Sequence, residues 1–404
     1  MKYISRSLEP LIKKAFRQFP AICLTGPRQS GKTTILKHTF PRISYISLEQ
    51  PDIRASAASD PRGFLDLLPQ PAILDEIQNA PDLLSYIKAI IDSKRETSGQ
   101  FILTGSQNLM MMEKISETLA GRTAVLHLLP LSGREIRKRP GFPLPWERKK
   151  AISSKRPYSL ERFWRSLLRG GFPELSAKPK MDAPLWLSSF TQTYLERDVR
   201  LLRQNGDLTL FRSFMRILAA RSGQLCNFTD IGRDLGIATN TVKSWISVLE
   251  TCHLVTILRP FSANIGKRLV KSPKIYFTDT GLLCHLVGLR EPGHAAAGPM
   301  AGVIFETAVI VEVMKSLLHR GRIPHLYFWR TSNGLEVDLI IEQEGNLIPI
   351  EIKSSSTPRP EMAKSILSFR KDFKGRPHPG YVVHPGENLL PLGGGVKALP
   401  FHML

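Results

Sequence analysis

The stretch GPRQSGKTT, residues 26–34, decides the fold of the N-terminal part of this chain. It fits the pattern G-x-x-x-x-G-K-[ST] at every defined position, which is the pattern of a P-loop. The glycines allow a tight turn whose backbone N–H groups point at a phosphate, and a helix follows with its positive end toward the same anion. In such a loop Lys32 reaches the outer phosphates, and the Thr33 hydroxyl ligates Mg²⁺. We expect nine residues to surround the phosphates of ATP: Gly26, Pro27, Arg28, Gln29, Ser30, Gly31, Lys32, Thr33 and Thr34.

The sequence on either side of the loop provides the setting that this motif needs. AICLTG, residues 21–26, is typical of a short apolar strand that runs into the loop, and TTILKHTF, residues 33–40, of the helix that follows it. Further along, PAILDEIQ, residues 71–78, is an apolar strand that ends in Asp75 and Glu76. Asp75 would hold Mg²⁺ through water, and Glu76 would polarise the attacking water as a general base. The alternative for this acidic pair is a solvated strand end.

Three more strands are expected at residues 44–48, 101–104 and 124–129, with helical segments between them. This alternation predicts an α/β fold in which helices cover both faces of a parallel sheet. Together with the P-loop, it indicates an ATPase domain.

Polar residues near two of these strands are candidate sensors of the nucleotide. Ligands of open α/β sheets bind at the carboxyl ends of the strands, where Ser106, Gln107 and Asn108 lie. One of them, with Ser106 first in line, could sense the γ-phosphate, or the segment is an ordinary turn. Arg122 is a candidate arginine finger that would stabilise transition-state charge, or else a surface arginine before a strand.

The composition favours an anionic partner. The 404 residues include 56 Lys and Arg against 35 Asp and Glu, a formal net charge of +21, so nucleic acid is the first candidate. A generally basic proteome or an anionic membrane surface would explain the same charge. The four cysteines form no C-x-x-C pair, which argues against a zinc site or a disulfide framework and suits the cytoplasm. No signal-peptide core and no run near the roughly 18 apolar residues of a membrane span is visible, so we expect no membrane partner.

The middle of the chain combines a basic, proline-rich stretch with a helix-turn-helix pattern. Residues 140–169 look like a linker or an insertion, whose cations could touch phosphates or form a solvated run. Residues 228–236 and 237–255 predict two helices, with Thr239 as the N-cap of the second. Strands after them, at 254–258 and 274–277, would form a wing.

If this unit binds DNA, the start of its second helix enters the major groove. The residues that would face the groove are Thr239, Asn240, Thr241, Lys243 and Ser244, and those in the wing are Lys267, Arg268 and Lys271. Winged helices also serve as protein–protein modules inside ATPases, and the sequence leaves both uses open.

The last third of the chain carries a second group of charged residues. Residues 302–321 predict an amphipathic helix on which Glu306 shares a face with apolar residues, and a carboxylate there is costly unless it is paired or binds a metal. LEVDLIIE (residues 335–342) and LIPIEIK (residues 347–353) are strands joined by the turn QEGN.

That turn fixes the register of the two strands. Glu342 faces Leu347, so Asp338 faces Glu351, and Glu336 faces Lys353. Period two puts these four charged residues on one face, and the other face carries Leu339, Ile341, Ile350 and Ile352. Two opposed carboxylates repel, and a divalent cation would relieve that repulsion. The pattern is that of a metal-dependent phosphodiesterase with Asp338 and Glu351 as ligands, or of a salt-bridge ladder on a solvated face.

Taken in order, the motifs resemble a known family. The matching segments are LTGPRQSGKTT, AILDEIQ, ILTGS, LAGR, LLPLS, RGGFPE, YLERDVR, the winged helix, YFTDTGLL, FE, WR with EVDLII, and IEIKSS. The chain resembles the bacterial and archaeal AAA+-type P-loop ATPases that carry a C-terminal PD-(D/E)XK nuclease-like domain. The resemblance implies binding and hydrolysis of ATP with Mg²⁺, and a restriction-endonuclease-like α/β core. It places Glu306, Asp338, Glu351 and Lys353 at the nuclease-motif positions.

These observations predict four parts: an ATPase domain over residues 1–135, a basic linker and helical region over 136–205, a winged helix over 206–290, and a nuclease-like domain over 291–404. The function expected is that of a cytoplasmic, ATP-dependent protein that acts on DNA. Its rival is a signalling or regulatory ATPase whose C-terminal domain binds nucleic acid or protein and does not cleave. A helicase-like motor is a third candidate, but no strand-separation motif is visible. A homo-oligomer would be required if Arg122 acted across a subunit interface.

Overall fold

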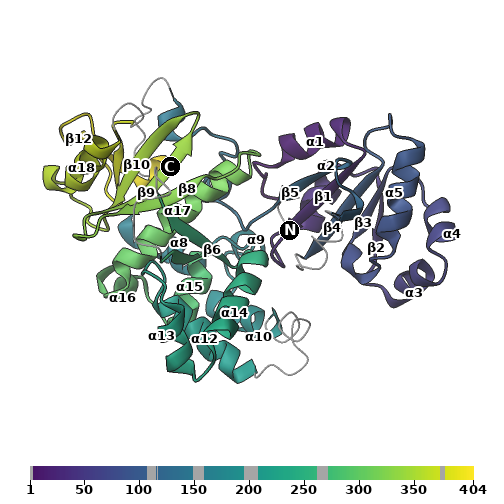
Figure 1. The fold of residues 1–404 in the computed structure, drawn as a ribbon, viewed down its shortest axis with the longest axis horizontal. Helices are drawn as coiled ribbons and strands as arrows, with labels where there is room; N and C mark the ends of the chain where they lie inside the picture. The colour runs from purple at the N-terminus through teal and green to yellow at the C-terminus, as the bar shows by residue number, and fades with distance from the viewer. Residues whose placement is uncertain are drawn as a thin grey trace.

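The computed structural model describes residues 3–106, 115, 117–148, 159–194, 208–261, 272–373 and 378–404. They form two lobes (Figure 1). The N-terminal α/β module is the lobe at the right of the figure, and the helical middle and the C-terminal sheet make up the other.

Five parallel strands form the sheet of the N-terminal lobe, in the order β2-β3-β4-β1-β5. They are β1 (Ala21–Gly26), β2 (Ser44–Ser47), β3 (Ala72–Asp75), β4 (Phe101–Ser106) and β5 (Thr123–His127). The parallel α/β sheet expected from the sequence is confirmed. Because all strands run the same way, the carboxyl ends of β1, β3 and β4 meet at one edge, where ligands of such sheets bind.

Helices cover both faces of this sheet, which explains why its central strands β1, β3 and β4 are buried and largely apolar. Cys23 and Leu103 pack in a cluster with α5 on one face, and Leu24 and Ile102 pack with α1 and α2 on the other. The helical elements of this lobe are α1 (Glu9–Gln18), α2 (Lys32–Thr39), α3 (Pro51–Ser59), α4 (Pro61–Asp66), η1 (Ile77–Asn79) and α5 (Leu83–Ser93).

The second lobe begins with short elements after β5 and continues as a layer of helices. The short elements are α7 (Gly133–Ile136) and η2 (Pro145–Glu147). The helices are α8 (Leu160–Arg169), α9 (Pro173–Ala177), α10 (Ala183–Tyr194), α12 (Leu208–Ala220), α13 (Phe228–Leu235), α14 (Thr239–Thr251), α15 (Thr280–Leu286) and α16 (Pro292–Ala297).

The helix-turn-helix pair is α13 and α14. Gly236 ends α13 in the left-handed conformation, with φ of +67°. The apolar face expected on α14 is buried, and it consists of Val242, Trp245, Ile246 and Leu249. The prediction that Thr239 caps α14 is wrong: the extended backbone that precedes the helix belongs to Ala238, so Thr239 is already the first helical residue.

Eight strands form the sheet of the second lobe, in the order β12-β13-β11-β10-β9-β8-β6-β7. They are β6 (Val255–Pro260), β7 (Lys274–Phe277), β8 (Leu326–Arg330), β9 (Glu336–Gln343), β10 (Asn346–Ile352), β11 (Tyr381–His384), β12 (Leu390–Pro391) and β13 (Lys397–Pro400). The two strands expected as a wing pair antiparallel, and β6 also pairs with β8 through Arg259 and Tyr327. The helix-turn-helix unit and the C-terminal strands therefore share one sheet.

The helix α17 (Ala301–Leu318) lies at the centre of this lobe, against β10, α15 and α16. We expected an amphipathic helix here, and that expectation is wrong, because 14 of its 18 residues are buried. A helix that is apolar on most sides is a core element rather than a surface one. The remaining elements are η4 (Pro360–Ala363), α18 (Lys364–Asp372) and η5 (Phe401–Met403).

Candidate functional site

The P-loop makes a tight turn that requires glycine at its first position. Gly26 has a φ of +148°, and a Cβ atom there would overlap the carbonyl oxygen of Leu128. Gly31 has a φ of +94° and directly precedes α2. Such conformations let successive backbone N–H groups face one anion at the start of a helix. The loop therefore has the shape that its two glycines predict.

Two buried side chains of the loop suit a bound phosphate. Lys32 is only 6% exposed, and its Nζ donates to the carbonyl oxygens of Gly26 and Pro27, both at 3.0 Å. Ser30 Oγ is buried and has no hydrogen-bond partner in the part of the chain that the structure describes. A phosphate oxygen could accept from both groups, so the loop fits the triphosphate that its sequence predicts.

Asp75, at the end of β3, joins the P-loop to its neighbouring strands. Thr33 Oγ1 donates to Asp75 Oδ2 at 2.9 Å, and the hydroxyls of Tyr45 and Thr104 donate to the same carboxylate. Burial raises the pKa of Tyr45, and the hydrogen bond to Asp75 raises it further. Hydroxyl and carboxylate oxygens are the ligands that Mg²⁺ prefers, so Thr33 and Asp75 fit the metal ion of a bound nucleotide.

A cavity of about 590 Å³ opens beside the loop, which is large enough for a nucleotide. Its walls come from both lobes: the P-loop and Glu49 and Glu76 on one side, and α9 and α10 on the other. The lining residues are Arg28, Gln29, Gly31, Lys32, Thr33, Thr34, Glu49, Glu76, Pro173, Glu174, Phe190 and Thr193. The Glu76 backbone has a φ of +57°, and its carboxylate accepts from Gln78 Nε2. The candidate base thus lies on the cavity, next to the residues proposed to hold ATP.

Ser106 and Arg122, the candidate sensors of the nucleotide, have different outcomes. Ser106 ends β4 beside Gly26, as expected, but its side chain and the residues 107–108 lie outside the described part. Arg122 precedes β5, so it lies at the opposite edge of the sheet from the P-loop, and it forms a bidentate pair with Asp92 at 2.6 and 3.0 Å. Arg122 lies at the amino ends of the strands and the P-loop at their carboxyl ends, so the length of a strand separates them. Arg122 therefore does not reach the nucleotide site of its own chain. A finger that acts on a neighbouring subunit stays a prediction.

A buried ion network connects the P-loop to the second lobe. Arg6 donates to the Ser30 carbonyl oxygen at 2.9 Å and to Glu135 Oε1 at 3.2 Å. His319, at the end of α17, accepts from the Leu129 N–H through Nε2 at 3.1 Å, and its Nδ1 lies 3.3 Å from Glu135 Oε1. Burial alone would raise the pKa of Glu135, but Arg6, His319 and the Ser132 N–H outweigh it and hold the pKa well below its usual range. Glu135 is therefore an ionised, buried carboxylate that contacts residues of both lobes.

The turn after α14 also meets the N-terminal lobe. His253 has a φ of +54°, and its ring packs edge-on against His127 with 5.1 Å between centroids. His127 is hydrogen-bonded through Nδ1 to Thr25 Oγ1, one residue before the P-loop. Burial lowers the pKa of His253 to about 3, helped by repulsion from His127 and Lys32. A neutral histidine of the helix-turn-helix unit thus packs close to the nucleotide site.

The second site is a cluster of charged residues on the sheet of the other lobe. The predicted register holds: Leu347 pairs with Glu342, and Ile350 with Leu339. Continuing that register by one pair brings Asp338 opposite Glu351. Asp338 Oδ2 accepts from the Ile352 N–H at 2.7 Å. The hairpin therefore brings the two carboxylates together, as the turn predicts.

Hydrogen bonds fix the Glu351 carboxylate on both oxygens. Lys353 Nζ donates to Oε1 at 2.5 Å, and Ser365 Oγ donates to Oε2 at 2.6 Å. Burial raises the pKa of Asp338 well above its usual range, and Glu351 and Glu306 raise it further. Burial also raises the pKa of Glu351, although Lys353 and Ser365 act against this. Both carboxyls therefore take up a proton more readily than an exposed acid does.

Lys274, from β7, reaches the same cluster from the other side. Its Nζ lies 3.2 Å from Glu306 Oε1 and also pairs with Glu336, which Arg330 Nη1 binds at 2.8 Å. Tyr276 donates to Glu306 Oε1 at 2.5 Å. Glu306 and Glu336 are thus neutralised by protein groups. Asp338 and Glu351 differ in that they also repel each other, although Lys353 pairs with Glu351.

This difference bears on where a metal ion would fit. Among the described residues, no three His, Cys, Asp or Glu side chains converge as a group able to hold a metal ion. The fit therefore rests on the pair Asp338 and Glu351, whose hard oxygen donors and mutual repulsion suit Mg²⁺. Glu306 is engaged by Lys274 and Tyr276 instead.

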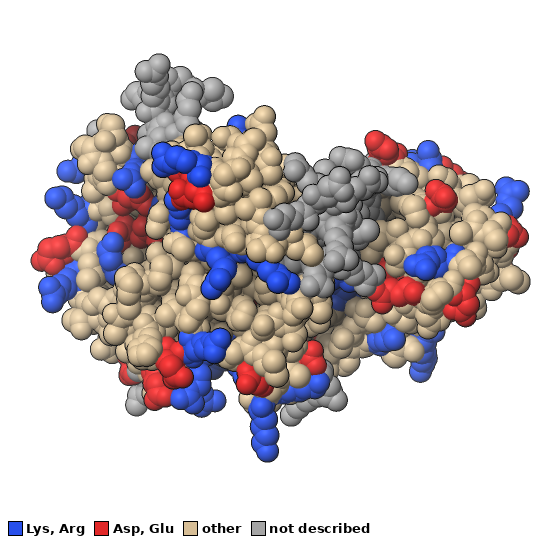
Figure 2. Space-filling view, turned by 90° about the horizontal axis from the view of Figure 1, so that it is seen from below, with Lys and Arg blue, Asp and Glu red and all other residues tan. Residues whose placement is uncertain are grey.

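The residues expected to bind DNA lie at the start of α14. Asn240, Lys243 and Ser244 are exposed, whereas Thr239 and Thr241 are half-buried. The expected wing residues Lys267, Arg268 and Lys271 lie outside the described part of the chain. Figure 2 shows one face of the molecule, on which the lysines and arginines of the described residues lie among acidic residues over most of the surface.

Several residues of these sites have no signal in the sequence. Arg6, Tyr45, His253 and Lys274 reach their partners only through the tertiary fold. Lys274 had one weak signal, a lysine at the start of a strand whose next residues are all apolar or aromatic. No spacing rule connects the others to the motifs.

Comparison with known proteins identifies the class of the N-terminal lobe. Residues 18–137 match the family described as AAA domain. Residues 160–293 and 301–404 match two families that are each described as a domain of unknown function. The N-terminal lobe is therefore an AAA-type P-loop ATPase domain.

Full-length relatives identify the family more closely. The chain is 31% identical over 393 residues to the uncharacterized protein Rv2008c of Mycobacterium tuberculosis, covering 96% of this chain and 82% of that protein. It is 20% identical over 373 residues to an uncharacterized protein of Haemophilus influenzae, covering 87% and 86%. The chain belongs to the same family as Rv2008c. A solved structure, the Walker-type ATPase PABY2304 of Pyrococcus abyssi, is 13% identical with a TM-score of 0.46, covering 70% of this chain and 96% of that one.

In the part of the chain that the structure describes, no helix is long and apolar enough to cross a membrane.

Proposed function

We propose that this protein is an ATP-driven enzyme that acts on DNA and hydrolyses phosphodiester bonds at Asp338 and Glu351 with Mg²⁺. The observation that carries the proposal is the placement of two buried carboxyls that repel each other beside a lysine. Lys353 pairs with Glu351, yet burial and the repulsion from Glu351 still raise the pKa of Asp338 well above its usual range. Placing two buried acids side by side is costly, and a functional site is where such a cost is retained.

The chain's own residues would prepare this site. When bound, Mg²⁺ would act as a Lewis acid and lower the pKa of a water molecule. Ser365 and the Ile352 N–H hold the two carboxylates in place. Burial alone would lower the pKa of Lys353, but Glu351 and Asp338 outweigh it, so the ammonium stays charged at neutral pH. Lys353 is therefore able to donate to a phosphate oxygen as negative charge develops on it.

The ATPase half of the proposal rests on the cavity between the lobes. ATP there would draw Lys32 away from the loop carbonyls, and Glu76 would accept a proton from the attacking water. Because α9 and α10 form the far wall, the nucleotide would bridge the two lobes. Binding and hydrolysis would then change how the lobes are held together. The exposed start of α14 is the surface that we propose for DNA.

The test is cleavage of plasmid and linear DNA with Mg²⁺ or Mn²⁺ by purified protein. We expect cutting by the wild type and its loss in Asp338→Asn and in Lys353→Ala. Lys371→Ala, an exposed lysine of α18, is the matched control and should cut normally. Cutting that survives both site variants would contradict the proposal, because a contaminating nuclease is indifferent to them.

One observation favours a second function. Lys274 and Tyr276 occupy Glu306, so one of the expected nuclease acids is already paired within the protein. A regulatory ATPase whose C-terminal sheet binds a partner without cleaving would need no more than this. Intact ATP turnover with no cutting in any sample would favour that function.

A further inference from the structure

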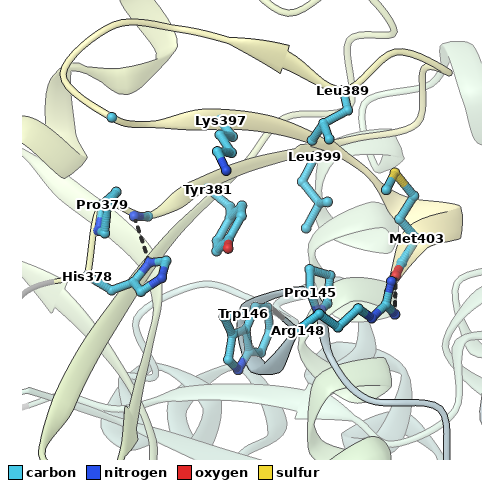
Figure 3. A pocket seen from close by; sticks show the side chains of 12 residues that line it. Pro145, Trp146, Arg148, His378, Pro379, Tyr381, Leu389, Lys397, Leu399 and Met403 are labelled. Carbon is cyan, nitrogen blue, oxygen red and sulfur yellow. Dashed lines mark hydrogen bonds between the residues drawn. The ribbon is translucent and has the colours of Figure 1, made fainter. Parts of the chain in front are cut away.

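A second cavity, of about 210 Å³, lies on the face of the C-terminal sheet opposite to Glu351 (Figure 3). It opens between the segment around η2 and the strands β11 and β13. Tyr381 on β11 pairs in register with Ile350, so it points to the face opposite to Glu351. The cavity is therefore separate from the carboxylate pair, and it is also separate from the nucleotide cavity between the lobes.

Three flat rings and two cations line this cavity. The Trp146 and Tyr381 rings have centroids 5.9 Å apart, and His378 stacks on Tyr381 at 5.5 Å with 22° between the ring planes. Arg148 and Lys397 supply positive charge, and no Asp or Glu is among the described residues that line the cavity. Burial lowers the pKa of His378, helped by Lys397, so this ring is neutral at pH 7. The lining combines aromatic surface with positive charge only.

The wall that carries Trp146 is rigidly anchored. Trp146 Nε1 donates to Gln343 Oε1 at 3.3 Å, and the next residue, Glu147, accepts from Arg320 at 2.7 and 3.1 Å and from Arg322 at 2.9 Å. These bonds fasten the segment to the end of β9 and to the loop that follows α17. A ring held in this way loses little freedom when a ligand packs against it, which favours binding.

Lys397 and the Tyr381 hydroxyl are the polar groups that a ligand could engage. Neither makes a side-chain hydrogen bond or ion pair with any residue in the described ranges. Figure 3 shows the Lys397 amino group pointing toward the Tyr381 ring and the Tyr381 hydroxyl pointing into the open space. Arg148 is used differently, because its guanidinium donates to the carbonyl oxygens of Pro143 and Met403.

We propose that this cavity binds a nucleobase together with its phosphate. The base would stack on the Tyr381 and Trp146 rings, and Lys397 at the mouth would pair with the phosphate. The volume is below the roughly 300 Å³ of typical small-molecule pockets, so it suits one base with its sugar and phosphate outside. A paired base is stacked inside its duplex and cannot enter. The ligand is therefore a free mononucleotide or one unit of a single strand, and the site does not depend on the nuclease activity proposed above.

Binding measurements on full-length protein can test this site. The Lys32→Ala background removes nucleotide binding at the P-loop. The probes are a fluorescently labelled single-stranded dT oligonucleotide, the same sequence as a duplex, and unlabelled dTMP as a competitor and in calorimetry. We expect Tyr381→Leu to weaken single-strand binding about ten-fold, the typical loss when one stacked base contact is removed. Lys397→Ala should weaken it less and reduce the salt dependence by about one phosphate contact.

The controls separate a local loss from unfolding. Tyr381 is buried, so Tyr381→Leu is compared with Lys397→Ala, which removes an exposed side chain and leaves the core intact. Lys371→Ala should bind like the parent protein. If dTMP binds to the parent protein and this binding is lost in Tyr381→Leu and Lys397→Ala, the ligand is a free nucleotide. If these variants lose binding of the oligonucleotide only, the ligand is a single strand. Unchanged binding of every probe to both Tyr381→Leu and Lys397→Ala would overturn the proposal.

Discussion

Replacing Glu135 with alanine should weaken the contact between the two lobes, because this side chain is a buried anion that binds residues of both. Its Oε1 accepts from Arg6 Nε at 3.2 Å and from the Ser7 N–H at 2.8 Å, and its Oε2 accepts from the Ser132 N–H at 2.8 Å. Glu135 is fully buried, and Arg6 is 4% exposed. Glu135→Ala would leave the Arg6 guanidinium buried without its counter-ion.

The expected cost follows from that burial. Removing one member of a buried pair destabilises a protein by about 3–5 kcal/mol, because the remaining charge stays out of water. An exposed pair is the matched control: Glu161 and Arg165 are 67% and 68% exposed, and Glu161→Ala should cost less than about 1 kcal/mol. Because the Glu135 pKa is lowered by folding, its stabilisation is present above its unfolded pKa of about 4.3 and is lost as pH falls toward the folded value.

Urea unfolding followed by tryptophan fluorescence can measure this difference. All five tryptophans lie in the second lobe, so the signal reports the lobe that contains α17 and His319. A loss of 3 kcal/mol at an m-value of about 3 kcal/mol/M lowers the midpoint by about 1 M. In a double-mutant cycle, Arg6→Ala and Glu135→Ala should couple by about 1–3 kcal/mol. A midpoint for Glu135→Ala no lower than that of Glu161→Ala, or no coupling with Arg6→Ala, would show that the network does not hold the lobes together.

Four further changes have expected outcomes. Lys32→Ala should abolish ATP binding in calorimetry, and Glu76→Gln should bind ATP without turning it over; normal hydrolysis by both would contradict the roles given to them. Gly26→Ala should also abolish ATP binding, because its Cβ would overlap the Leu128 carbonyl oxygen, whereas Gly302→Ala, a helical position with nothing within 4 Å, should bind normally. Asp338→Asn should raise stability at pH 7 in metal-free buffer by roughly 1 kcal/mol or more, since folding raises the Asp338 pKa and the buried carboxylate therefore loses stability as pH rises. Thermal melts at pH 4 to 8 should show that the stability of Asp338→Asn relative to the wild type grows with pH. A difference that shrinks as the pH rises would contradict the cost assigned to the buried carboxylate.

The parts of the fold that local sequence patterns determine were predictable. The P-loop, β3 with Asp75, and the β9–β10 hairpin are each specified within a few consecutive residues, and the two-residue turn at Glu344 and Gly345 sets the register. The central strands of the N-terminal sheet are largely apolar because both of its faces are covered. Such signals do not depend on distant residues.

The parts that were missed depend on contacts between distant residues. Arg6 and Glu135 are 129 positions apart, and Leu129 and His319 are 190 apart, so no spacing connects them. The sequence left open whether Glu306 is paired or binds a metal, and Lys274 from a different element pairs with it. The helix α17 was expected to be amphipathic, but its charged residues Glu312 and Lys315 bind the segment 131–134 inside the protein. Arg122 precedes β5 and lies away from the P-loop of its own chain, so only a role toward a neighbouring subunit stays a prediction for it.

The most direct measurement is the initial rate of Mg²⁺-dependent DNA cleavage with and without ATP, in the wild type and in Lys32→Ala. If the P-loop site drives the carboxylate pair through the contacts between the lobes, ATP should change the wild-type rate and leave the Lys32→Ala rate unchanged. Equal rates in all four samples would show that the ATPase domain does not control the C-terminal site, and no cleavage in any of them would show that the pair Asp338 and Glu351 is not a phosphodiesterase centre.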